Sequence, residues 1–83
     1  MDRERQRRVK KRFGKRLRKL RKARGLTQAA LASAAGLDPS YLGKIERGES
    51  NVALVNIHRI AEALEVEAGE LFGESGAQTN GKA

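Results

Sequence analysis

The sequence of 83 residues contains no cysteine, one proline and one histidine, His58. Without cysteine the chain can form neither a disulfide bond nor a thiolate metal site, and nothing indicates an oxidising compartment. No apolar run approaches the ~20 residues that span a membrane, and no apolar signal segment follows the basic N-terminus. We therefore expect one small domain that acts in the cytoplasm and has no membrane partner.

The residue types needed for catalysis are also scarce. The sequence has no glycine-rich phosphate loop, and no two acidic residues share one apolar face of an expected helix. His58 has no second type of metal ligand arranged around it. We predict that the protein is not an enzyme, and that it needs no metal, no cofactor and no small-molecule ligand.

Positive charge is plentiful and concentrated at one end of the chain. The net charge is +8, and residues 1–24 hold 14 of the 18 lysines and arginines with only two acidic residues. Residues 25–83 hold four lysines and arginines against eight acidic residues. A cluster this dense favours a polyanionic partner, with nucleic acid ahead of an anionic membrane.

Apolar residues recur at helical spacing along the whole chain. Val9, Phe13, Leu17 and Leu20 form one stripe and predict a helix over about residues 9–24. Residues 1–8 have no apolar anchor, so we expect a disordered basic arm there. Residues 73–83 have no apolar side chain larger than alanine, and we expect a disordered tail.

Two further helices meet through a short turn. Thr27 is a suitable N-cap for a helix over 28–35 that stops at Gly36. Asp38, followed by proline at the first helical position, begins a helix that ends near Arg47. Two short helices joined by about three residues are typical of a helix-turn-helix.

A fourth helix over about 54–64 and a last helical turn over about 68–72 complete the expected elements. The fold class predicted for residues 9–72 is all-α, a compact five-helix bundle that contains the helix-turn-helix. Ala53 stands at the N-cap position of the fourth helix, so that cap moves to Asn51 or is lost, at a cost of about 1 kcal/mol.

The stretch from Leu26 to Gly48, LTQAALASAAGLDPSYLGKIERG, resembles the phage-repressor (Cro/Xre-type) helix-turn-helix family. The resemblance continues through IAEAL at 60–64 and ELF at 70–72. Within that family, the runs SYL at 40–42, ERG at 46–48 and NIHRIA at 56–61 look most like controller proteins of restriction–modification systems. The resemblance implies a lambda-repressor-like DNA-binding domain that regulates transcription as a homodimer.

The resemblance also implies roles for individual residues. Residues 39–47 would form the recognition helix, and Arg21 would form a partly buried ion pair with Glu46. The residues implied for DNA contact are Gln28, Arg47 and Asn51 on the phosphate backbone, Pro39, Ser40, Gly43 and Lys44 on the exposed groove-facing side, and Tyr41 near thymine methyl groups and phosphates. Pro39 and Gly43 offer few hydrogen-bonding groups to bases, so specificity leans on DNA shape. Tyr41 has a second interpretation, in which it packs under the turn.

These observations lead to one main hypothesis. We expect a sequence-specific transcriptional regulator that binds a pseudo-palindromic double-stranded DNA operator as a homodimer. The basic arm, through Arg3, Arg5, Arg7 and Arg8, would add phosphate or minor-groove contacts. Leu71 and Phe72 are the expected apolar contacts at the two-fold axis.

Two alternatives use the same basic segment differently. In one, the protein is an antitoxin-like or bridging module, and its arm docks on an acidic protein partner. In the other, residues 9–24 lie on an anionic membrane, but that competes for the apolar stripe that the core needs.

Overall fold

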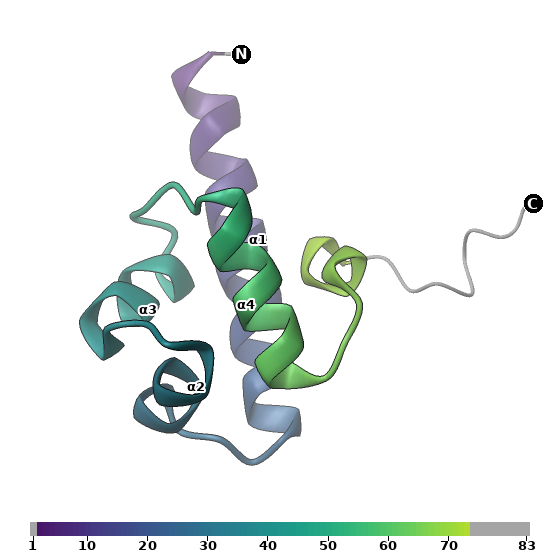
Figure 1. The fold of residues 1–83 in the computed structure, drawn as a ribbon. Helices are drawn as coiled ribbons and strands as arrows, with labels where there is room; N and C mark the ends of the chain where they lie inside the picture. Colours follow the sequence, from purple (N-terminus) through teal and green to yellow (C-terminus); the bar gives the residue numbers. More distant parts are fainter. Residues whose placement is uncertain (1, 74–83) are drawn as a thin grey trace, which may run out of the picture.

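The computed structural model describes residues 2–73, which fold into four α-helices and one 3-10 helix with no strand among them (Figure 1). The elements are α1 Arg3–Ala23, α2 Gln28–Ala35, α3 Pro39–Glu46, α4 Leu54–Leu64 and η1 Ala68–Phe72. The predicted all-α bundle with a helix-turn-helix is confirmed, although its fifth helix is a short 3-10 helix. Residues 74–83 of the expected tail lie outside the described residues.

The first helix is longer than the sequence pattern predicted. It begins at Arg3, because the Asp2 carboxylate accepts a hydrogen bond from the Arg5 backbone N–H (2.8 Å) and caps the first turn. Residues 3–8 are therefore helical in the structure, where a disordered arm was expected. The first turns of α1 project beyond the other helices (Figure 1).

The core lies between α1, the helix-turn-helix and α4. Its fully buried large side chains come from every element, and they are Leu17, Leu31, Leu42, Ile45, Ile60, Leu64 and Leu71. Burying each such side chain contributes about 1.5–3 kcal/mol. This core fixes the position of α3 relative to α1 and α2.

Helix α1 approaches the end of α3 very closely at Gly14. A Cβ atom at Gly14 would overlap the backbone carbonyl oxygens of Ile45 and Glu46. A glycine within a helix costs about 0.5–1 kcal/mol relative to alanine. At this position glycine allows the two backbones to touch, because any residue with a side chain would place a Cβ atom between them.

The turn of the helix-turn-helix follows the predicted cap residues. Gly36 ends α2 in the left-handed conformation (φ 71°), which glycine adopts without strain. The Asp38 carboxylate then accepts a hydrogen bond from the Ser40 backbone N–H (2.7 Å), and Pro39 occupies the first position of α3. The fourth helix has no side-chain cap, because Ala53 stands at its N-cap position.

Candidate nucleic-acid interface

A buried ion pair holds the end of α3 against α1. Arg21 donates from Nε to Glu46 Oε2 (2.6 Å) and from Nη2 to Glu46 Oε1 (3.0 Å). Its third nitrogen, Nη1, donates to the Leu26 carbonyl oxygen (2.8 Å). The Glu46 side chain is only 3% exposed. The implied pair between Arg21 and Glu46 is therefore present, with two-pronged geometry that fixes the angle between the helices.

The protonation of Glu46 reflects this environment. Burial raises the pKa of Glu46, but hydrogen bonds from Arg21 and Gln28 outweigh burial and leave it below its ordinary value. The hydrogen bond to Glu46 in turn raises the pKa of Arg21. Both groups are charged near neutral pH, so the contact is a true ion pair.

Gln28 begins α2 and belongs to the same network. Its Nε2 donates to Glu46 Oε1 (3.0 Å), and its side chain is half-buried. Glu46 thus joins α1, α2 and the end of α3 through a single carboxylate. Gln28 lies at the first turn of α2, where unpaired backbone N–H groups favour an anion.

The exposed side of α3 carries Pro39, Ser40 and Lys44. The Ser40 hydroxyl donates to Asp38 Oδ1 (2.6 Å), so its proton is already engaged at the start of the helix. Hydrogen bonds from the Ser40 hydroxyl and backbone lower the pKa of Asp38. Lys44 is therefore the long cationic side chain that projects from the middle of this face.

Gly43 does not belong to the exposed face, and that part of the prediction is wrong. Gly43 is buried, and a Cβ atom there would lie 3.2 Å from Arg47 Nη1 and 3.4 Å from Gln28 Oε1. The absence of a side chain lets the long side chains of Gln28 and Arg47 lie across α3. Gly43 thus makes room for two side chains of the surface, although it is itself buried.

Tyr41 is tied to α4. Its ring is half-buried against the core, and its hydroxyl accepts a hydrogen bond from Asn56 Nδ2 (3.2 Å). This placement matches the interpretation in which Tyr41 packs within the fold.

Arg47 and Asn51 lie where α3 ends and the next loop begins, and both are exposed. Arg47 donates from Nε and Nη2 to the two carboxylate oxygens of Glu49 (2.9 and 3.3 Å). This pairing raises the pKa of Arg47 and lowers the pKa of Glu49. The charges of Lys44 and Lys11 lower the pKa of Glu49 further. The sequence analysis did not identify Glu49 as the partner of Arg47. A glutamate two residues after an arginine that is expected to bind phosphate could have indicated this pair.

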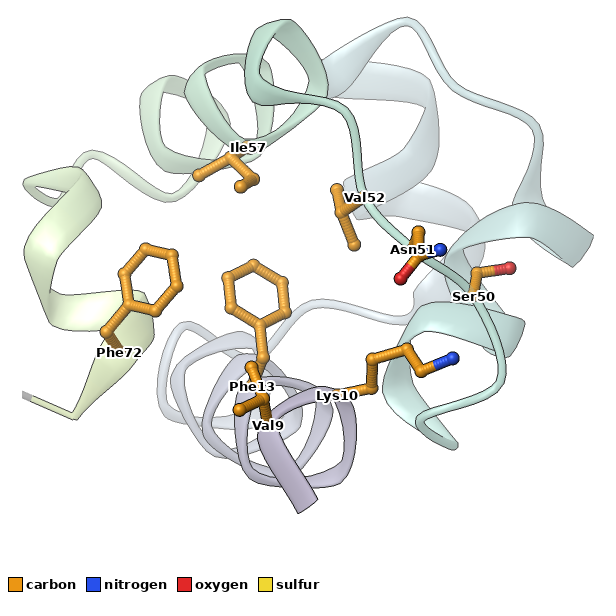
Figure 2. Close-up of a pocket in the computed structure, with 8 residues that line it drawn as sticks. All are labelled: Val9, Lys10, Phe13, Ser50, Asn51, Val52, Ile57 and Phe72. Atoms are coloured by element: carbon orange, nitrogen blue, oxygen red, sulfur yellow. The ribbon is translucent and has the colours of Figure 1, made fainter. Parts of the chain in front are cut away.

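Asn51 lines an open apolar groove between the first half of α1, the loop before α4 and η1 (Figure 2). The rings of Phe13 and Phe72 lie side by side in this groove, with centroids 5.2 Å apart. Val52 and Ile57 face them across the groove. Phe72 is 44% exposed and forms its rim.

Leu71 cannot take the place at a dimer interface that was expected for it, because it is completely buried in the core. The structure exposes two other large apolar side chains instead. Leu54 and Val55, at the start of α4, are 80% and 60% exposed. They line a shallow apolar hollow with Ile57, His58 and Ala68.

His58 lies on the exposed side of α4, with Nε2 3.5 Å from Glu62 Oε2. Between residues 2 and 73, no three acidic or histidine side chains cluster in a way that could hold a metal ion. No helix in that part of the chain is long and apolar enough to cross a membrane.

Comparison with known proteins places this geometry in a family. Residues 17–71 match the helix-turn-helix family model HTH_3. The chain is similar to the control protein C.MunI of a Mycoplasma species, with 42% identity over 67 residues that cover 80% of this chain and 90% of that protein. It is also similar to the immunity repressor protein of Bacillus phage phi105, with 41% identity over 61 residues, 74% of this chain and 42% of that protein.

Solved structures agree with the sequence relatives. The restriction–modification controller protein C.AhdI from Aeromonas hydrophila superimposes with a TM-score of 0.73 and 56% identity, over 74% of this chain and 92% of that one. An HTH_3 family transcriptional regulator from Vibrio cholerae gives a TM-score of 0.78 with 35% identity, over 82% of this chain and 38% of that one. The chain therefore belongs to the HTH_3 (Xre/Cro-type) helix-turn-helix family of DNA-binding transcriptional regulators, which are not enzymes.

Proposed function

We propose that the protein binds a pseudo-palindromic operator in the cytoplasm as a homodimer, with α3 in the major groove of each half-site. The observation that supports this most is the Glu46 network. It holds the C-terminal end of α3 against both α1 and α2 through hydrogen bonds of 2.6–3.0 Å. A recognition helix held this firmly loses little freedom on docking.

Few side chains on α3 can read bases, and this limits direct recognition. Lys44 can donate to guanine O6 and N7, Ser40 discriminates weakly, and Pro39 offers apolar contact alone. Gly43 is buried and contributes no side chain. Specificity then depends substantially on DNA shape and deformability around the contacted bases.

Phosphate contacts surround this helix in the proposal. Gln28 at the start of α2, together with Arg47 and Asn51 after α3, would hold the DNA backbone on either side of the groove. Arg47 would exchange its carboxylate partner Glu49 for a phosphate. Tyr41 would approach the backbone only along the exposed part of its ring. Positive charge in the first turns of α1 would add to the attraction of the DNA backbone.

The dimer surface in this proposal is the start of α4. Leu54 and Val55 are large, apolar and exposed. The hollow that they line adjoins the groove with Phe72 at its rim, because Ile57 lines both. A second copy of the chain would cover this face about a two-fold axis. The half-site centres would then lie one turn of DNA apart, about 10 bp.

The similarity to the controller proteins C.MunI and C.AhdI supports a role in controlling a restriction–modification system. No cofactor or small-molecule effector enters the proposal.

Selection of bound duplexes from a random DNA library, followed by footprinting, tests the proposal. We expect a two-fold symmetric motif with two protected major-groove segments about 10 bp apart. Enrichment of a single unrepeated half-site would contradict the homodimer. If no sequence is enriched and an acidic protein partner is recovered with the intact chain, the antitoxin-like alternative replaces DNA recognition.

A further inference from the structure

The first turns of α1 carry a density of positive charge that the fold itself does not require. Residues 3–12 hold seven lysines and arginines and one acidic residue, Glu4. Apart from Lys10, which is half-buried, all of these side chains are exposed. Like charges three or four residues apart repel one another on a helix, and positive charge near a helix N-terminus opposes the helix dipole. An anion bound along this segment would relieve both effects.

Because residues 3–8 are helical, their arginines point to different sides. Residues three or four apart share a face of a helix. One set is spaced so that it continues the contacts of α1 with α3. We call it the inner stripe, and it consists of Arg3, Arg7, Lys11, Gly14, Arg18 and Arg21. A second set lies on the other side of α1. We call it the outer stripe, and it consists of Arg5, Arg8, Arg12, Lys15 and Lys19.

Three contacts and one electrostatic effect fix the direction of the inner stripe. Arg21 bonds to Glu46, and a Cβ atom at Gly14 would overlap the last carbonyl groups of α3. The backbone of Lys11 lies against Gly48, where a Cβ atom would approach the Lys11 Cα to 2.8 Å. Arg18 acts on Glu46 through its charge and helps to lower its pKa. The inner stripe therefore runs along the C-terminal end of α3.

The outer stripe lies on the side of α1 that faces Gly73, at the end of η1. Arg12 Nη2 lies 3.7 Å from the position that a Cβ atom of Gly73 would take. Lys15 and Lys19 line the same shallow hollow beside Gly73. Arg5 and Arg8 continue this set toward the N-terminus, so they point away from the end of α3.

The inner stripe meets the loop that would hold the DNA backbone. Lys10 lines one groove with Ser50 and Asn51 (Figure 2). The charge of Lys11 helps to lower the pKa of Glu49, the partner of Arg47. A phosphate strand held by Arg47 and Asn51 would therefore continue past the inner face of α1. The family model matches residues 17–71, so the match does not by itself assign a role to the first turns of α1.

We propose that the first turns of α1 bind duplex DNA as a rigid basic helix, in which Arg3 and Arg7 contact phosphates and Arg5 and Arg8 do not. This inference rests on the proposed function and makes it more specific. A flexible arm would use all four arginines alike, whereas a helix fixed by its contacts with α3 uses only the arginines on the inner side.

Two double variants with equal charge test the inference. The full chain carrying Arg3→Gln and Arg7→Gln is compared with the full chain carrying Arg5→Gln and Arg8→Gln, because glutamine preserves helix propensity. Binding to a mixed-sequence duplex is titrated over a series of salt concentrations. Circular dichroism of both free proteins checks that α1 keeps its helical content.

The inference predicts an asymmetric result. Loss of Arg3 and Arg7 should flatten the slope of log K against log salt by about 2 units per subunit, at 0.9 per phosphate contact. Loss of Arg5 and Arg8 should leave the slope nearly unchanged. An equal effect of both variants, or a larger effect of the Arg5 and Arg8 pair, would overturn the inference in favour of a flexible arm.

A third variant separates failure of this inference from failure of the proposed function. If neither double variant changes the slope but Lys44→Ala weakens DNA binding, the role of α1 is wrong and the role of α3 stands. If the unsubstituted protein does not bind duplex DNA at all, both proposals fail.

Discussion

Lys44 offers the most direct test of recognition at the scale of single residues. It projects from the middle of the exposed face of α3, and in the proposed complex its ammonium group would donate to guanine. Lys44→Ala should weaken binding to the selected operator by about 1–3 kcal/mol and relax the preference at one base pair. Lys19→Ala, on the outer stripe, serves as the control in the same titration. An equal loss on operator and random duplexes would reassign Lys44 to a phosphate.

Glu46 should make stability depend on pH. Its pKa is lowered in the folded protein by hydrogen bonds from Arg21 and Gln28. The stability it contributes is therefore complete above its unfolded pKa of about 4.3, and is lost as pH falls through the lower folded value. Denaturant titrations from pH 7 to about pH 2 should show this loss in the unsubstituted protein and a smaller loss in Glu46→Gln.

The Glu46→Gln variant should also be less stable at neutral pH, because it leaves Arg21 without its charged partner in a nearly buried site. Removing one member of a buried pair costs about 3–5 kcal/mol. Arg47 is paired with Glu49 on the open surface, so Glu49→Gln provides a matched control with a small effect. Equal stabilities for the two variants would contradict the structural importance of the Glu46 network.

Some residue placements could not be predicted from the sequence. The implied pair between Arg21 and Glu46 is present, because the spacing of the family motif fixes both partners. The exposure of Gly43 was predicted wrongly, since its burial depends on side chains from Gln28 and Arg47 that lie over it. A pattern along one helix does not contain that information.

At the scale of elements, the contact between α1 and α3 depends on Gly14. Gly14→Ala would improve intrinsic helix propensity by about 1 kcal/mol, yet its methyl group would overlap the carbonyl groups of Ile45 and Glu46. We expect a net loss of about 1–3 kcal/mol in thermal or denaturant unfolding. Lys15→Ala, at the next exposed position, should be nearly neutral. A stabilised Gly14→Ala protein would show that the two helices do not touch at this point.

Cap residues explain which elements were predictable. Thr27 and Asp38 predicted where α2 and α3 begin, because an N-cap side chain is a local signal that needs no tertiary information. Asp2 caps α1 in the same way, but the lack of apolar residues before Val9 made the first turns resemble a disordered arm. Helix propensity and a good cap are enough to order residues that bury nothing.

At the scale of the whole molecule, assembly should depend on the start of α4. Leu54→Glu places a charge on a side chain that is 80% exposed, so it should leave the fold of the subunit intact. We expect sedimentation velocity to show dissociation to monomers and a parallel loss of operator affinity. Leu71→Ala is the contrasting variant, because its buried position predicts a loss of stability of about 2–5 kcal/mol. A monomeric unsubstituted protein would contradict the dimer.

The expected dimer contacts show the limit of sequence patterns at this scale. Leu71 and Phe72 are adjacent, yet Leu71 fills the core and Phe72 forms the rim of a groove. Helical spacing shows that Leu54 lies near the core-facing residues of α4, but only the three-dimensional fold shows that nothing in the subunit covers it.

The uneven distribution of charge has a consequence for the kinetics of association. Positive residues crowd the first turns of α1, whereas four acidic residues lie at the end of α4, in the turn after it and on η1: Glu62, Glu65, Glu67 and Glu70. In the electric field of a DNA duplex, such a molecule experiences a torque as well as an attraction. It would turn its basic side toward the duplex during approach, so that a larger share of collisions is productive. Electrostatic steering of this kind raises association rates by about 10–1000-fold at low salt, and added salt removes the gain.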